Sequence, residues 1–460
     1  MHWNRLVVPL ASAALVACGS SNTLSSGSSS SNTGTGATGA TSGSGGHGSS
    51  SGTSATAASS TGSTAASTST STSGSSGSTT GTTGTIATDC LASSPGWGGA
   101  QSAGGGTLCA TPGWCDLPGT HMRDVCPDAS LCGGIQAYEG CSGVLNDWGG
   151  AALDSSQNML ILWGGGHHGY FGNEVYALDL NRLVMLRLND PSDVSGFDPN
   201  NCDAPDAYPD GRPVSRHTYD GLTYIPSSYE LFSWSGAKAP CGYSGTDIWT
   251  LDLPTVGSTA LGGAAPWTER DSTVTSGQLR ADPGSVSDYD AHDDQVVFDD
   301  LYSLWSFSDA TGVTLLLDHS NNALDDHMTG RIDPVNHLFI VMGNASAAPA
   351  GGVFAFDLTT NPPTRSDWTS QVTGCDGLIQ ASYPGLSYDT QLNKFVGWVG
   401  GNTVYIFDPS TKSCTTQDYT GGPAANANGT FGRFRYVPSL DVFAVVNGVD
   451  QDAYTLRLGP

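Results

Sequence analysis

The chain has 460 residues, of which 42 are acidic and 16 are basic, so its formal net charge at pH 7 is −26. All the acidic residues follow Thr88, which places this charge on residues 89–460. A surface of this sign repels nucleic acid and anionic lipid, and we therefore expect no nucleic-acid partner.

The first 18 residues have the layout of an export signal. One arginine precedes an apolar stretch of about a dozen residues, which is too short to span a membrane as a helix. The ending Leu15-Val16-Ala17-Cys18 resembles that of bacterial lipoprotein signals, in which the cysteine is lipidated and becomes the new N-terminus. The resemblance implies a membrane anchor at Cys18, and Gly19 implies an outer-membrane or cell-surface location. An ordinary signal peptide that contains a cysteine is the alternative.

Residues 19–88 consist almost entirely of Ser, Thr, Gly and Ala. Such a segment cannot bury apolar area, so the composition predicts a disordered linker. A flexible coil of this length would span roughly 45 Å root-mean-square. We expect it to hold the following domain clear of a membrane surface.

Ten cysteines remain after Cys18, an even number that predicts up to five disulfide bonds in an exported protein. Six of them lie between Cys90 and Cys141, where we expect three bridges whose pairing the sequence does not fix. For the other four we predict two bridges, Cys202–Cys241 and Cys375–Cys414. The chain has no Cys-x-x-Cys pair, so we predict no structural zinc site, and we expect no metal or other cofactor.

From residue 146 onward one pattern recurs at a spacing of roughly 40 to 50 residues. A strand ends at a tight turn, a second apolar strand follows, and a glycine and a loop lead to a third strand that ends near Asp. The copies begin with "GGAALDSSQNMLILWGG", "DGLTYIPSSYELFSWSG", "TGRIDPVNHLFIVMG", "PGLSYDTQLNKFVGWVGG" and "GRFRYVPSLDVFAVVNG", and a looser copy spans 286–317. Short sheets bury their faces when they are arranged radially, so the repeat predicts an all-β propeller.

The glycine pair after the second strand, third strands such as "VYALDL", and a Trp in the fourth strand resemble the kelch and galactose-oxidase-like propellers over residues 114–458. The number of copies predicts six blades, with seven as the alternative if 281–324 holds two. The last copy has only three strands, and "GWCDLPGT" at 113–120 resembles a kelch fourth strand. We therefore expect a Cys-rich segment, 89–145, that contributes the closing strand to a propeller at 146–460.

Two loops are expected to open on the propeller face that carries most ligand sites. "GGGHHGYFGN" connects the second and third strands of the first blade, and "RPVSRHTYDG" enters the first strand of the second blade. We therefore expect two groups of side chains to meet at the mouth of the ring: His167, His168 and Tyr170 from the first blade, and Arg216, His217 and Tyr219 from the second.

Aligning the first strands on their turns gives two further groups. One column holds Trp148, Tyr219, His327, Tyr383 and Phe431; the other, four residues later on the same strand face, holds Thr223, Arg331, Ser387 and Arg435, with Arg433 at the same parity. Aromatic faces stack on sugar rings and guanidinium groups hold carboxylate or sulfate, so these columns favour a carbohydrate site. The alternative is a polar channel whose residues bond one another around trapped water.

Three classes of function remain. The first is a monomeric cell-surface module that binds a glycan or a surface protein. The second is a uronate lyase, with His168 or His217 as base, Tyr170 or Tyr219 as acid, and Arg216 or Arg433 neutralising the substrate carboxylate. The third, a copper-radical oxidase implied by the resemblance, is disfavoured because no histidine follows His337. Whether the protein is an enzyme stays open.

The remaining histidines and the acidic turns are interpreted without a ligand. We take His121, His292, His319 and His337 as surface or packing residues. The acidic turns, including "DYDAHDD" at 288–294, lack the spacing of a calcium loop, and we take them as solvated.

Overall fold

The computed structural model describes residues 101–127, 134–135, 137–194, 197–202, 205–253, 266–270, 279–280, 284–344 and 351–459. All of these belong to the compact unit Gly81–Pro460. The predicted signal, the anchor at Cys18, the linker, Cys90 and Cys132 lie outside the described residues. A search of the described part of the chain finds no helix with the length and apolar character needed to cross a membrane.

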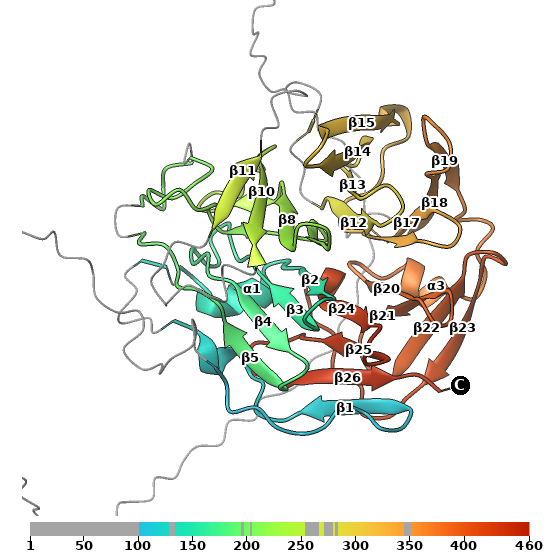
Figure 1. Ribbon diagram of the computed structural model, residues 1–460, viewed down its shortest axis with the longest axis horizontal. Helices are drawn as coiled ribbons and strands as arrows, with labels where there is room; N and C mark the ends of the chain where they lie inside the picture. Colours follow the sequence, from blue (N-terminus) through green and yellow to red (C-terminus); the bar gives the residue numbers. More distant parts are fainter. Residues whose placement is uncertain are drawn as a thin grey trace, which may run out of the picture. The chain divides into compact units, whose positions relative to one another are not determined.

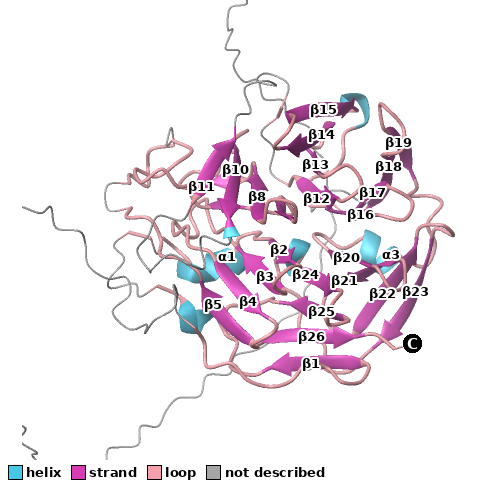
Figure 2. Ribbon diagram, in the orientation of Figure 1, coloured by secondary structure: helices cyan, strands magenta, loops and turns pink. Residues whose placement is uncertain are grey.

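Six four-stranded antiparallel sheets are arranged around one axis, which confirms the six-bladed propeller (Figures 1 and 2). The first three blades lie in chain order. Blade 1 consists of β2 (Ala151–Asp154), β3 (Met159–Leu162), β4 (Tyr176–Asp179) and β5 (Val184–Arg187). Blade 2 consists of β7 (Leu222–Ile225), β8 (Glu230–Trp234), β10 (Ile248–Asp252) and β11 (Trp267–Arg270). Blade 3 consists of β12 (Val286–Asp290), β13 (Gln295–Asp299), β14 (Ser303–Ser308) and β15 (Gly312–Asp318).

The other three blades complete the ring. Blade 4 consists of β16 (Thr329–Asp333), β17 (Leu338–Gly343), β18 (Gly352–Asp357) and β19 (Thr364–Asp367). Blade 5 consists of β20 (Gly385–Asp389), β21 (Lys394–Trp398), β22 (Thr403–Asp408) and β23 (Ser413–Asp418). Blade 6 consists of β24 (Phe434–Val437), β25 (Val442–Val445), β26 (Ala453–Arg457) and β1 (Gly113–Leu117). The looser copy is a single blade, so the seven-bladed alternative is wrong.

Short elements fill the connections. Strand β6 (Arg216–His217), which leads into blade 2, pairs with β9 (Ala237–Lys238), which lies in the connection between β8 and β10. Within the described residues, the short helical segments are η1 (Met122–Val125), η2 (Gly140–Ser142), α1 (Gly143–Asn146), η4 (Ser320–Asn322), α3 (Asp376–Ile379) and η5 (Phe431–Arg433).

The ring closes as the sequence predicts. Strand β1 pairs antiparallel with β26, placing Trp114 opposite Leu456. The Trp114 ring packs 5.3 Å from that of Trp398 in blade 5, so the closing strand joins the apolar interface between blades 5 and 6. The first strands of successive blades contact one another around the axis, and β24 returns to β2.

The turn between the first and second strands has the same backbone in every blade. Its last residue adopts a positive φ in all six copies: Asn158, Tyr229, Asp294, His337, Asn393 and Asp441. In blades 1, 3, 4 and 5 an aspartate ends the first strand and accepts a backbone N–H bond from the turn, as Asp333 does from Val335 at 2.9 Å. This local chemistry, repeated in sequence, is what makes the blades recognisable before the structure.

Four disulfide bonds join described cysteines. Cys109–Cys115 and Cys126–Cys141 lie in the N-terminal cluster. Cys202–Cys241 and Cys375–Cys414 are the two bridges predicted from the sequence, and both are confirmed.

Candidate functional site

The loop between β3 and β4 meets the entry to blade 2 because three successive glycines let the backbones approach. Gly166 has a φ of 69°, and a Cβ on it would lie 2.2 Å from the Cα of Arg216. The backbone N–H of Gly166 donates to the Ser215 hydroxyl at 2.8 Å, and that hydroxyl donates to the carbonyl of Gly164 at 3.0 Å. His167 is thereby carried to the mouth of the ring, where its imidazole lies 5.5 Å from that of His217.

A collar of rings surrounds the axis at the same level. We use this name for Trp148, Tyr219, His327, Tyr383 and Phe431, the column predicted from the strand alignment. All five have positive φ values, between 47° and 62°, so one repeated left-handed turn aims one ring from each of five blades inward. In blade 3, Gly284 stands two residues before the first strand, as His327 and Tyr383 do in theirs, and it also has a positive φ of 97°.

Ring contacts link the collar to the histidine loop. His217 lies 5.1 Å from Trp148 and 5.9 Å from Tyr219, and His327 lies 5.4 Å from Tyr219 and 4.4 Å from Tyr383. Tyr383 and Phe431 are 5.0 Å apart. The loops and strand entries that the sequence predicts to converge therefore do so.

The row of rings extends from the collar to solvent through the histidine loop of blade 1 and Tyr138 of the N-terminal segment. His168 is 4.9 Å from His167, and Tyr138, which is 86% exposed, is 6.1 Å from His168. The backbone N–H of Tyr138 donates to the carbonyl of His168 at 3.2 Å and fixes this end of the row. Tyr138 was not predicted, because it lies outside the repeat and no copy offers an equivalent position.

Burial keeps the inner histidines uncharged. It lowers the pKa of His217 to about 3, and the neighbouring imidazoles of His167 and His327 act in the same direction. Burial, followed by the proximity of His168, also lowers the pKa of His167, while a hydrogen bond with the Cys241 backbone opposes that shift. Near pH 7 these imidazoles are neutral, so each has one donor and one acceptor nitrogen, and His167 uses one of its two nitrogens in the bond with the Cys241 backbone.

A buried carboxyl group lies beneath the histidine loop and was also missed. The side chain of Asp147 occupies the space between Gly143 and Gly169, and a Cβ on Gly169 would lie 1.6 Å from its Oδ2 atom. Burial, with a smaller effect of Glu139, raises the pKa of Asp147 to about 7. The glycine after the two histidines is therefore explained by the carboxyl group that it admits.

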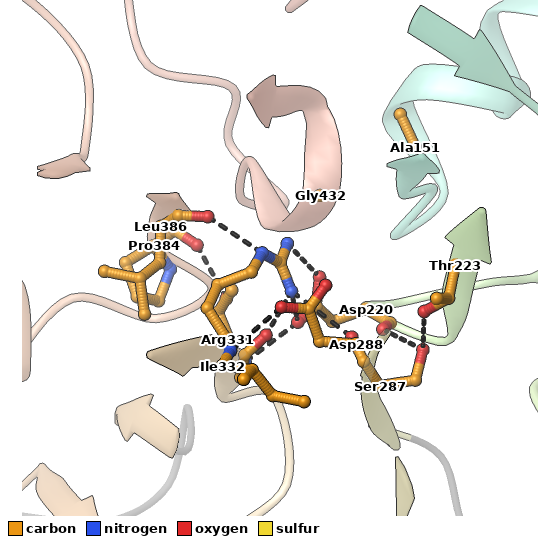
Figure 3. A network of polar contacts seen from close by, with 12 residues as sticks. Ala151, Asp220, Thr223, Ser287, Asp288, Arg331, Ile332, Pro384, Leu386 and Gly432 are labelled. Carbon is orange, nitrogen blue, oxygen red and sulfur yellow. Dashed lines mark hydrogen bonds and ion pairs between the residues drawn. The ribbon is translucent and has the colours of Figure 1, made fainter. Parts of the chain in front are cut away.

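The predicted arginines are at the axis or beside it, but each already has protein partners. Arg331 forms a two-pronged ion pair with Asp220, at 2.6 and 2.7 Å, and its Nε donates to the Leu386 carbonyl at 3.0 Å (Figure 3). In the same network, the hydroxyls of Thr223 and Ser287 lie 2.8 Å apart. These groups fill the axis below the collar, as in a polar channel whose residues bond one another.

The other predicted polar groups are engaged in the same way. Arg216 is fully buried and pairs with Asp247 at 2.8 Å. Arg433 donates to the backbone carbonyls of Leu145 and Gly429, and Arg435 to those of Gly432 and Ala151, at 3.0 and 3.2 Å. Tyr170 is buried with its hydroxyl 2.5 Å from Glu174. The Ser387 hydroxyl accepts the backbone N–H of Tyr436 at 2.8 Å.

Comparison with known proteins gives no family: no family model matches the chain, and neither does any curated protein. Among solved structures, a protein of unknown function from Bacteroides thetaiotaomicron is 12% identical, with a TM-score of 0.41 and coverage of 78% of this chain and 76% of that one. An auxiliary nutrient binding protein from the same organism is 9% identical, with a TM-score of 0.40 and coverage of 70% and 69%.

A gluconolactonase from Xanthomonas campestris is 12% identical to this chain, with a TM-score of 0.35 and coverage of 77% of this chain and 97% of that one. At these identities and TM-scores the similarities carry no argument about activity. The six-bladed fold rests on the strand order of the protein itself.

Proposed function

We propose that this protein is an exported, lipid-anchored binding protein whose kelch-type propeller holds carbohydrate at the mouth of the ring. The observation that carries the proposal is the continuous row of rings from exposed Tyr138, through His168 and His167, to the collar. Aromatic side chains with a few well-placed polar groups are the usual lining of small-molecule sites. The indole N–H of Trp148 has no hydrogen-bond partner among the described residues, which leaves a donor for a ligand or a bound water.

The charge around the mouth favours a neutral sugar. Burial keeps the imidazoles of His167 and His217 uncharged near pH 7, and the arginines are paired or bonded to backbone carbonyls within the protein. In a chain with a net charge of −26, an anionic glycan would find little at this site to offset the overall repulsion. The lyase alternative loses support for the same reason, since Arg216 and Arg433 are not free to neutralise a uronate.

A glycan array probed with the purified full chain tests the proposal. We expect binding to neutral glycans, and we expect Trp148→Ala to reduce the signal at least tenfold. Tyr229→Ala is the matched control, because Tyr229 has a similar φ, 59° against 49°, and is half exposed on a turn at the opposite end of blade 2. Binding confined to uronate polymers, or equal binding by the two variants, would contradict the assignment.

The anchor is tested separately. Cells fed a labelled fatty acid should incorporate the label into the chain, and Cys18→Ser should abolish incorporation and release the protein from the membrane fraction. If the label persists in Cys18→Ser, or if none enters the natural chain, the lipoprotein part of the proposal is wrong while the carbohydrate site is unaffected.

A further inference from the structure

A second cluster of chemically active side chains lies at the other end of the propeller, away from the mouth. His292 belongs to the turn between β12 and β13, and His337 ends the turn between β16 and β17 in the next blade. Their rings are 4.4 Å apart. The two turns are far apart in sequence, and the radial packing of blades 3 and 4 brings them together.

Carboxylates from the first turn complete the cluster. His292 Nδ1 lies 2.8 Å from one Asp293 oxygen, and His337 Nε2 lies 4.0 Å from the other. His292, Asp293 and His337 each offer one potential ligand atom, and these three atoms all lie within 4.8 Å of one another. Asp290 adds oxygens 3.0 and 3.1 Å from His337 Nε2.

The cluster is partly fixed and partly free. The His337 side chain is only 9% exposed, its carbonyl accepts the backbone N–H of Leu358 at 3.0 Å, and Asp290 accepts the backbone N–H of His292 at 3.1 Å. The side chains of His292 and Asp293 are 70% and 47% exposed and can move. They border a hollow of about 480 Å³ that is also lined by Pro334 and Val335. One fixed imidazole, that of His337, and two exposed side chains that can move thus border the same open space.

We propose that His292, Asp293 and His337 bind one divalent transition-metal ion of the Zn²⁺ class. Two imidazole nitrogens and a carboxylate form a donor set that Zn²⁺ accepts, at metal–ligand distances of about 2.0–2.2 Å. Closing the donors around an ion needs only a small movement of the two exposed side chains. Asp290, whose carboxylate oxygens lie 3.0 and 3.1 Å from the same His337 Nε2, is close enough to supply a fourth ligand oxygen once that nitrogen binds the ion. Ca²⁺ does not suit the site, because it prefers an all-oxygen shell.

This inference revises the interpretation of His292 and His337 as surface or packing residues and the expectation of no metal. The sequence contains no usual spacing of metal ligands here, because His292 and His337 are separated by the length of a whole blade. The strongly acidic surface raises the local concentration of cations and favours uptake.

Isothermal titration of the purified full chain with ZnCl₂ tests the site. We expect one Zn²⁺ per chain, and at least tenfold weaker binding in His292→Ala and in Asp293→Asn. His337→Asn removes the third ligand while keeping the turn, because asparagine occupies this position with a positive φ in blades 1 and 5. His121→Ala is the control, since His121 is 39% exposed and lies 3.3 Å from Asp452, outside the cluster; it should titrate like the natural chain.

Two results would overturn the proposal. One is an isotherm that is unchanged in both His292→Ala and His337→Asn. The other is loss of binding in His168→Ala but not in His292→Ala, which would place the ion at the mouth. Thermal melting of each variant without metal identifies any that has failed to fold.

Discussion

The imidazole rings of His167 and His217, which are 50 residues apart in sequence, lie 5.5 Å apart at the mouth of the propeller. One is carried by a loop of blade 1 and the other by the strand that enters blade 2. Their contact depends on a backbone-to-backbone approach at Gly166 that a side chain would prevent. The histidine loop is therefore held by packing of the main chain rather than by the histidines themselves.

Gly166→Ala should separate the loop from blade 2. The cost combines a left-handed φ of 69° with a clash against the Arg216 backbone. Gly401→Ala is a matched control, because Gly401 has a φ of 70° and a Cβ added to it would meet nothing within 4 Å. We expect Gly166→Ala to lose about 2 kcal/mol more of the free energy of unfolding than Gly401→Ala. Urea unfolding at pH 7 measures both, and equal losses would contradict the role given to the close approach.

The two predicted disulfides provide a second matched comparison. Each closes a loop of 39 residues. Because both bridges therefore reduce the entropy of the unfolded chain equally, each is expected to stabilise the folded protein by about 4 kcal/mol. Only Cys202–Cys241 borders the site, because the Cys241 backbone is hydrogen-bonded to His167 and Gly242 lies against the same ring.

Replacing Cys202 and Cys241 by serine should weaken binding of the array-selected glycan as well as stability. The same replacement at Cys375 and Cys414 should lower stability to a similar degree and leave binding unchanged. Calorimetric melting and glycan titration of the two double variants separate these effects. Loss of binding in both, at a temperature where both remain folded, would rule out a specific role for the Cys202–Cys241 bridge.

What could be predicted from the sequence follows from the repeat. The blade number and the collar positions could be predicted because the same strand pattern occurs several times in one chain. The closing strand could be predicted because the last copy has only three strands of its own. The ion-pair partners of the arginines could not be predicted from the repeat. Arg216, for example, pairs with Asp247, which lies in a loop whose path the repeat does not specify. Tyr138 precedes the first blade, where no second copy exists for comparison. Asp147 stands beside the collar position Trp148, but the sequence alignment does not show that its carboxyl group is buried between two glycines.

The buried pair Asp220–Arg331 should be a stability element rather than a ligand contact. Asp220→Asn leaves a fully buried guanidinium group without its counter-charge, which typically costs about 3–5 kcal/mol of the free energy of unfolding. Asp450→Asn breaks a similarly two-pronged pair with Arg123, at 2.8 and 3.1 Å, but on the surface, and should cost at most about 1 kcal/mol. Urea unfolding of both variants tests the difference. A similar small loss in each would show that the axial network contributes little.

The raised pKa of Asp147 predicts that the protein loses stability as the pH rises. Its pKa is raised from 3.8 to about 7 in the folded protein, so between these values the folded state holds a proton that the unfolded state has released. This contribution to the free energy of unfolding is fully present below pH 3.8 and is lost as the pH rises through 7.

Asp147→Asn carries no titrating group at this position, so the stability of the natural chain relative to this variant should fall between pH 4 and pH 8. A decrease on the order of 2 kcal/mol is expected from a shift of this size in a largely buried group. Asp124→Asn removes a carboxyl group at an exposed position on η1 and serves as the control for the loss of one negative charge. Urea midpoints measured at each pH give both curves, and a flat difference for Asp147→Asn would mean that the carboxyl group beneath the histidine loop is ionised without penalty.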